Sequence, residues 1–371
     1  MTSLQQPRRN GCENRRPHMN IVPFREADLE EAAALLARRH QEDRAHEATL
    51  PERFTQPDQA WVEVEKTWKA SMAREGSGGG VVVREGGRMI AYMIGVPKID
   101  EVWGRSVWVE LAGHAIDRRY SAEIYRDMYA ALSPGWVALG CLYHVSNIPA
   151  HDLDALEAWY NLSFGKEHVY GVRETAAALD GAAPTADPTL EIRRATAADV
   201  DLAMELDLAL PSHQARAPVY SILSPYHKEE ERQDVLEELQ KDDWKTWLAL
   251  RDGRLVGIQI YLPARPGQGI GALPIPDNSS FLGFAATRED EQGHGIGWRL
   301  TAHGLADAAA TGDTTCFTDW RATNLLSSRF WTRRGWRPVV YRLSRRLDSR
   351  ILWSHNHASS APWLMPTFSD H

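Results

Sequence analysis

A faint internal repeat constrains the fold of this sequence more than any other feature. Two segments, beginning at Pro23 and Arg194, each lead from a short apolar stretch into a helical pattern across an Ala-Asp pair. The two aspartates, Asp28 and Asp199, lie 171 positions apart. Further pairs keep nearly this spacing: Gly87 with Gly253 in two hairpin patterns, Cys141 with Cys316 in late strands, Trp159 with Trp331, and Phe164 with Trp336. Such a long repeat predicts two copies of one fold rather than a single large domain.

The repeat divides the 371 residues into two domains, at 20–179 and 190–348. Residues 180–189 are rich in Ala, Pro and Thr, which suits a linker. The basic and polar residues 1–19 contain no apolar signal segment, so we expect a disordered leader there, and residues 349–371 form a C-terminal tail. Each copy is expected to run strand, one or two helices, hairpin, strand, helix, strand, helix, strand. This order predicts an α+β sheet with helices on both faces.

The composition argues against several classes of protein. Hydrophobic residues make up 43% of the chain, yet no apolar run approaches the roughly 20 residues that span a bilayer, so we expect a soluble protein without a membrane partner. The net charge of −8 argues against a nucleic-acid partner. Three cysteines are too few and too scattered for a disulfide framework or a metal cluster. We therefore expect a cytoplasmic protein without a metal site.

The stretch EDEQGHGIGWRL, residues 289–300, places three glycines directly before a helical pattern. It follows the expected fourth strand of the second copy, residues 279–287, and the helix is expected over residues 297–310. A helix N-terminus offers backbone N–H groups without partners, and glycines let the main chain approach a phosphate closely. The pattern therefore indicates a phosphate-binding loop; the alternative is a plain strand-to-helix turn.

Two motifs in the second copy resemble those of the GCN5-related N-acetyltransferases, the GNAT family. Gln-x-x-Gly-x-Gly at 292–297 resembles motif A, which holds the pyrophosphate of coenzyme A, and residues 319–338 resemble motif B. The resemblance implies acetyl-CoA as co-substrate and two tandem GNAT-like domains, each a mixed, mostly antiparallel twisted sheet flanked by helices. It implies coenzyme contacts from Ala285, Ala286, Thr287, Gln292, Gly293, His294, Gly295, Ile296, Gly297, Asn324, Ser327 and Trp331.

The first copy departs from motif A at the matching position. After its expected fourth strand, residues 107–115, no glycine occurs between Ile116 and Leu132. Side chains such as Tyr120 and Glu123 would occupy or repel a pyrophosphate. We therefore expect a degenerate first domain and one coenzyme site, in the second domain. The first domain would be a scaffold, a wall of the acceptor pocket, or a site for a different ligand.

The residues that would transfer protons are Asp319 and Tyr341. Asp319, on the fifth strand, is the candidate for the base that takes the proton of the attacking amine; the alternative is a structural carboxylate bonded to Arg321 or a loop amide. Trp331 stands where many family members carry a Tyr, and an indole cannot protonate a thiolate. Tyr341 is therefore the candidate acid, and the alternatives are an unassisted thiolate or a proton from water.

The resemblance implies an acetyl-CoA-dependent N-acetyltransferase that moves an acetyl group to the amine of a small molecule by direct attack in a ternary complex. His213 and Tyr220 are candidate contacts to the acceptor; the alternative is a partly buried aromatic pair. A non-catalytic acyl-CoA-binding or sensing protein, and a transferase that uses another acyl-CoA, are the alternative functions. The sequence is compatible with a monomer or a homodimer.

Overall fold

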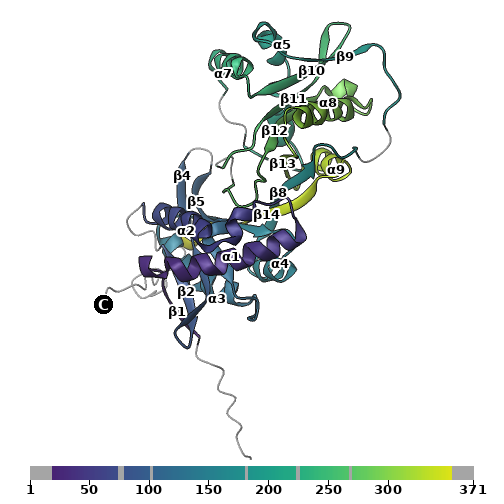
Figure 1. Cartoon of the computed structure of the whole chain (residues 1–371). Helices are drawn as coiled ribbons and strands as arrows, with labels where there is room; N and C mark the ends of the chain where they lie inside the picture. Colours follow the sequence, from purple (N-terminus) through teal and green to yellow (C-terminus); the bar gives the residue numbers. More distant parts are fainter. Residues whose placement is uncertain are drawn as a thin grey trace, which may run out of the picture.

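The computed structural model describes residues 19–73, 79–100, 103–179, 183–222, 226–266 and 270–352 (Figure 1). The first half contains β1 (Asn20–Pro23), α1 (Leu29–His46), α2 (Pro57–Ser71), β2 (Gly80–Glu85), β3 (Arg88–Ile94), β4 (Val96–Asp100), β5 (Gly104–Val109), β6 (His114–Ile116), α3 (Ile124–Ala138), β7 (Tyr143–Pro149), α4 (Leu153–Tyr160) and β8 (Gly165–Glu174). The second half contains β9 (Leu190–Arg194), α5 (Val200–Ala203), α6 (Ala209–Ala215), α7 (Lys228–Gln240), β10 (Lys245–Arg251), β11 (Arg254–Pro263), β12 (Ser279–Thr287), α8 (Ile296–Ala310), β13 (Thr315–Arg321), α9 (Leu325–Thr332) and β14 (Arg337–Arg346). The leader up to residue 18 and the tail from residue 353 lie outside the described residues.

The repeat predicted from the sequence is present in the structure. Four elements of the first half, α3, β7, α4 and β8, have the same lengths as α8, β13, α9 and β14, and each begins 172 positions before its counterpart. The α+β fold class, with mixed sheets flanked by helices, is confirmed. The match between the cysteines is wrong, because Cys141 lies two residues before β7 whereas Cys316 is the second residue of β13.

Each half completes its sheet with the last strand of the other half. Within the described residues, one sheet has the order β1-β2-β3-β6, and the other has the order β4-β5-β7-β14-β8-β13-β12-β11-β10-β9. The strand β14 pairs antiparallel with β7 and β8, and β8 also pairs antiparallel with β13. In Figure 1, β8 and β14 lie at the junction between the purple-to-blue first half and the green second half. The two halves therefore share one continuous sheet, an arrangement that the sequence did not predict.

The fourth strand of the first half is broken. The sequence predicts one strand over residues 107–115, whereas the structure has β5, a 3-10 turn at Leu111–Gly113, and then β6. Because β5 pairs with β7 and β6 pairs with β3, this stretch of chain passes from one sheet to the other. The third strand is interrupted at Gly95, where a Cβ atom would lie 2.4 Å from the ring of the buried Trp136. Close packing of this indole on the backbone thus accompanies the change of sheet.

The helix α8 packs closely on the second half of the shared sheet. Its buried residues include Leu300, Leu305 and Ala308. At Gly304, a Cβ atom would lie 2.2 Å from the ring of the buried Tyr261 on β11, so a larger side chain does not fit there without movement of the helix. This contact fixes α8 against the strands, and with it the loop that precedes the helix.

Separate expression of the two halves tests the strand exchange. The fragments 20–179 and 190–348 are expected to be insoluble or unfolded when produced alone, because β8 and β14 would each lose both neighbouring strands. Co-expression of the fragments is expected to give an equimolar, soluble complex, measured by affinity co-purification and size-exclusion chromatography. Two fragments that each fold as monomers, as judged by circular dichroism, would contradict the exchange.

Candidate functional site

The segment from the end of β12 into the first turn of α8, residues 288–297, has a backbone that glycine adopts readily. Gly293 and Gly295 have φ angles of +86° and +76°, in the left-handed region that other residues rarely adopt. Gly295 directly precedes α8, and no side chain caps this helix. The first N–H groups of α8 are therefore available to an anion, which the positive end of the helix dipole also favours. We call residues 288–297 the phosphate-binding loop.

A pocket of about 950 Å³ opens beside the phosphate-binding loop. The sequence-predicted coenzyme contacts that line it are Ala285, Ala286, Thr287, Gln292, Gly293, Gly295, Ile296, Gly297, Asn324, Ser327 and Trp331. His294 is not among the lining residues, and its side chain is 61% exposed. Residues of α6, including Ala209, Leu210 and Ser212, form another wall. The structure thus brings motif A and motif B residues together around one space.

The strands β12 and β13 separate beside this pocket. They pair in parallel from Ser279 and Thr315 as far as Leu282 and Thr318, where the Thr318 hydroxyl donates to the Leu282 carbonyl at 2.8 Å. On the other edge of β12, Gly283 is left out of the pairing with β11, which forms a bulge. Beyond Leu282, the edge of β12 toward β13 therefore has no strand partner within the described ranges.

Several arginines that sequence reasoning missed line the pocket, namely Arg216, Arg288 and Arg334. The nearby acidic residues Asp290 and Glu291 are paired with other cations, Arg254 and Arg251. Their negative charge is therefore partly neutralised. Arg288 itself pairs with Glu205, which also lines the pocket, so the pocket wall carries guanidinium groups together with carboxylates. No spacing in the sequence marks these arginines as a group, because they come from three separate segments.

Asn324 and Trp331 shape the wall that α9 gives to the pocket. Asn324 is buried, and its Oδ1 accepts hydrogen bonds from the backbone N–H groups of Leu326 and Ser327, both at 3.2 Å. It therefore caps α9 and fixes where the helix begins. Trp331 is also buried, and its ring packs edge-on against Trp336 with 5.0 Å between centroids. It supplies an apolar surface to the pocket.

The two candidate acceptor contacts lie apart in the structure. His213, on α6, lines the pocket, and its Nε2 lies 3.3 Å from Oδ1 of Asn324. Tyr220 is 75% exposed and is not among the residues that line this pocket. His213 therefore lies where an acceptor in the pocket could contact it, whereas Tyr220 does not contact the pocket. Both roles stay predictions.

Asp319 is the first residue of β13 beyond the last pair with β12, and it is not among the residues that line the pocket. Its Oδ2 is hydrogen-bonded to Nε2 of His168, which lies on the exchanged strand β8. The partner expected as an alternative, Arg321, pairs instead with Glu167. Sequence reasoning missed His168 because the residue belongs to the other copy, and only the strand exchange brings it to β13.

Tyr341 lies on β14, two strands away from β13. Nζ of Lys166 lies 3.6 Å from the centre of its ring, and the tyrosine is not among the residues that line the pocket. Burial raises the pKa of Tyr341. The structure therefore gives this candidate acid no contact with the pocket, and its role stays a prediction.

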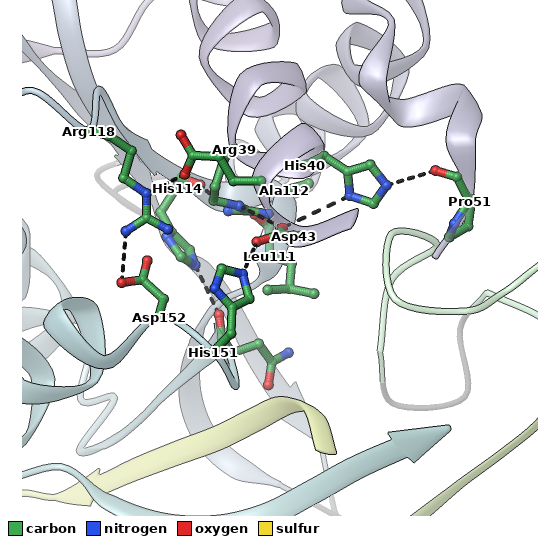
Figure 2. A network of polar contacts seen from close by, with 12 residues as sticks. Arg39, His40, Asp43, Pro51, Leu111, Ala112, His114, Arg118, His151 and Asp152 are labelled. Carbon is green, nitrogen blue, oxygen red and sulfur yellow. Dashed lines mark hydrogen bonds and ion pairs between the residues drawn. The ribbon is translucent and has the colours of Figure 1, made fainter. Parts of the chain in front are cut away.

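The matching cleft of the first half is filled by its own side chains (Figure 2). The strands β5 and β7 pair as far as Val109 and Ser146. Beyond that pair, His114 places its imidazole across the gap, with Nε2 2.9 Å from the carbonyl oxygen of Asn147. Burial lowers the pKa of His114 to about 3, so the ring is neutral. Arg39 donates to the His114 carbonyl at 2.5 Å.

An ion pair further closes this first-half cleft. Arg118 contacts Asp152 at 2.9 Å and also Glu42 (Figure 2). Asp152 caps α4 and lies 172 positions before Asn324, which caps α9 beside the second-half pocket. A separate hollow of about 420 Å³, lined by Glu42, Arg118 and Asp152 among others, lies beside this ion pair, against about 950 Å³ for the second-half pocket. That the chain has one coenzyme site, in the second half, stays a prediction.

Two further features of the described residues concern metal ions and membranes. Among those residues, no group of three or more His, Cys, Asp or Glu side chains could hold a metal ion. In the same part of the chain, the helices are too short or too polar to cross a membrane.

Residues 216–336 match the acetyltransferase (GNAT) family model. No curated protein matches the chain. Among solved structures, the chain is similar to a GCN5-related N-acetyltransferase from Sphaerobacter thermophilus, with a TM-score of 0.56, 14% identity, and coverage of 88% of this chain and 95% of that chain. It is also similar to the GCN5-related glucosamine N-acetyltransferase region of a fungal multi-domain GH3 beta-N-acetylglucosaminidase, with a TM-score of 0.50, 13% identity, and coverage of 88% of this chain and 38% of that chain. These similarities concern the fold.

Gly295→Glu tests the phosphate-binding loop. The side chain would strain a left-handed backbone and displace Pro184, which lies 2.6 Å from the new Cβ atom, and its carboxylate would repel a phosphate at the start of α8. The affinity for coenzyme A is expected to fall by more than about 100-fold in isothermal titration calorimetry, since like charges in contact cost several kcal/mol. The matched control is Gly312→Glu, which alters a left-handed glycine just after the other end of α8. Equal affinity in wild type and Gly295→Glu would contradict the assignment.

Proposed function

Because the second half of the chain contains a domain of the acetyltransferase (GNAT) family, we propose that this protein transfers an acetyl group from acetyl-coenzyme A to the amine of a small molecule. The proposed active site is the second-half pocket. One observation carries this proposal: the uncapped N-terminus of α8, behind Gly293 and Gly295, borders a pocket at the point where β12 and β13 separate.

The residues of the pocket fit a phosphorylated coenzyme. A Cβ atom on Gly293 would meet no atom within 4 Å, whereas one on Gly295 would lie 2.6 Å from Pro184, so the open space lies at Gly293. The N–H groups of the phosphate-binding loop and of the first turn of α8 are proposed to hold the pyrophosphate. The free edge of β12 at Ala285–Thr287 is proposed to pair with the pantetheine amides as an added strand would. When bound, acetyl-coenzyme A supplies a thioester carbonyl for attack by a free amine, with the thiol as leaving group.

Asp319 is proposed to take the proton of the amine, because an ammonium has no lone pair with which to attack. Backbone N–H groups near the bulge at Gly283 are proposed to polarise the carbonyl. Tyr341 lies on β14, two strands from the strand β13 that carries Asp319, so in this proposal the departing thiolate takes its proton from water.

The proposed acceptor approaches from the side of α6, where His213 lines the pocket. The first half, whose own cleft is filled by His114 and Arg118, is proposed to serve the second half as a scaffold. A cytoplasmic location, a monomeric or homodimeric state, and the absence of nucleic-acid and membrane partners are parts of the proposal that rest on composition.

Asp319→Asn tests the proposed base. The amide accepts no proton at neutral pH, so turnover is expected to fall about 100-fold, the lower end of what a general base contributes. The affinity for coenzyme A is expected to stay unchanged, because Asp319 does not line the coenzyme pocket. The measurement is thiol release from acetyl-CoA with a panel of small amines. Asp348→Asn, which alters a half-exposed carboxylate paired with Arg350, is the matched control.

The wild-type protein itself separates the alternative functions in this assay. Binding of coenzyme A without thiol release for any amine or acyl thioester would indicate a binding or sensing protein. Faster release from a different acyl thioester would indicate a transferase of that acyl group. A protein that does not bind coenzyme A would contradict the proposal.

A further inference from the structure

The exchanged strand β8 brings a side chain of the first half to the proposed base. In the pairing of β8 with β13, Tyr170 lies opposite Asp319 and His168 lies opposite Arg321. Nε2 of His168 is hydrogen-bonded to Oδ2 of Asp319. Among the described residues, Oδ1 of Asp319 has no hydrogen-bond partner, and the side chain is 29% exposed. One carboxylate oxygen is thus held by the first half, while the other is open.

The matching position of the repeat lacks this pair. A shift of 172 residues relates Asp319 to Asn147 and His168 to Val340, and β14 pairs with β7 in the same register as β8 pairs with β13. Neither Asn147 nor Val340 ionises. In the described part of the chain, the amide of Asn147 has no hydrogen-bond partner at all. The strand exchange itself therefore does not require a histidine and an aspartate at these positions. Of the two matching positions, the His168–Asp319 pair occurs on the side that has the open pocket.

The groups around the pair keep Asp319 ionised and His168 neutral. Burial alone would raise the pKa of Asp319, but His168, Arg342 and Arg321 hold it below its ordinary value. Burial lowers the pKa of His168, against the opposing effect of Asp319. The charged and titratable groups that face the pair are Arg321 from β13, Glu167 and Tyr170 from β8, and Arg342 from β14. A neutral His168 then donates its Nε2–H to the carboxylate, and its buried Nδ1 has no hydrogen-bond partner among the residues that the structure describes.

Asp319 lies where β12 and β13 separate, so the orientation of its carboxylate decides which way its oxygens point. It directly follows Thr318, the last residue of β13 that pairs with β12, whose hydroxyl donates a hydrogen bond to the Leu282 carbonyl. A carboxylate at this point rotates about its side-chain bonds unless one oxygen is held. The hydrogen bond from His168 supplies this restraint from a neighbouring strand, which is itself fixed on both edges by β13 and β14.

We propose that His168 is a positioning residue for the active site of the second half. It holds Oδ2 of Asp319, so that Oδ1 is directed to the amine and receives its proton. The first half thereby contributes to the chemistry of the second half through one side chain. This inference rests on the proposed function, in which Asp319 is the base.

Three substitutions of His168 test this role. His168→Gln keeps an N–H donor at the distance of Nε2, His168→Asn has the same amide on a shorter side chain, and His168→Val copies the residue at position 340. His144→Gln is the matched control, because His144 is a buried imidazole of the first half that contacts Tyr129 and the Cys141 carbonyl and not Asp319. Steady-state rates are measured across pH with one amine, so that ionisation of the acceptor contributes equally to all variants.

His168→Val and His168→Asn are expected to lower kcat about 10- to 100-fold, the effect of a misplaced catalytic group, while KM for acetyl-CoA stays the same. Loss of the hydrogen bond raises the pKa of Asp319, so the acidic limb of the pH profile of kcat is expected to move to higher pH. His168→Gln is expected to restore most of kcat, and His144→Gln to keep the wild-type profile. If His168→Val does not fold, the comparison of Gln with Asn decides the question.

Wild-type rates and pH profiles in both His168→Asn and His168→Val would overturn this inference and leave the proposed function intact. Equal losses in His168→Gln, His168→Asn and His144→Gln, each with an unchanged pH profile, would also overturn it, because they would indicate a structural role only. Absence of turnover in the wild-type protein would overturn the proposed function, and this inference with it.

Discussion

The reciprocal exchange of β8 and β14 determines where the other parts of this protein lie. Both neighbours of β8, namely β14 and β13, belong to the second half, and both neighbours of β14, namely β7 and β8, belong to the first half. Together the two strands connect β7 to β13. The backbone hydrogen bonds of the two strands therefore join the halves more firmly than a packed interface between two finished domains would. Through this exchange, β8 becomes the strand next to β13, and His168 comes to lie beside Asp319.

Much of the second-half pocket could be predicted from the sequence because its signals are local. The glycines at 293 and 295 mark a left-handed backbone before a helix, and Asn324 marks the start of the next helix. Strand order is a different kind of information. Alternation of apolar residues shows which side chains share a face, but not which strand lies alongside. For this reason the contact of His168 with Asp319 could not be predicted. The sequence does show that the repeat places a histidine at 168 where the second copy has Val340.

The two halves show how one fold supports an open cleft and a filled one. In the second half, the strands separate beside a glycine loop and leave backbone groups free. In the first half, His114 bonds across the equivalent gap and Arg39 bonds the carbonyl of that same residue, so the polar backbone is satisfied without a ligand. The break in the fourth strand could not be predicted from the sequence. It accompanies the contact between Gly95 and Trp136, which depends on packing between distant segments.

The strand exchange also has a consequence for how the chain is made. The strand β8 ends at Glu174, whereas its two neighbours begin at Thr315 and Arg337. At the usual rate of about 5–20 residues per second, a ribosome needs roughly 10 to 30 seconds to reach them. During that time both edges of β8 are unpaired, so the first half cannot finish folding before the second is made. The ends of this strand carry Lys166 and Glu167, and Arg173 and Glu174, charges of the kind that oppose association between exposed strand edges in a nascent chain.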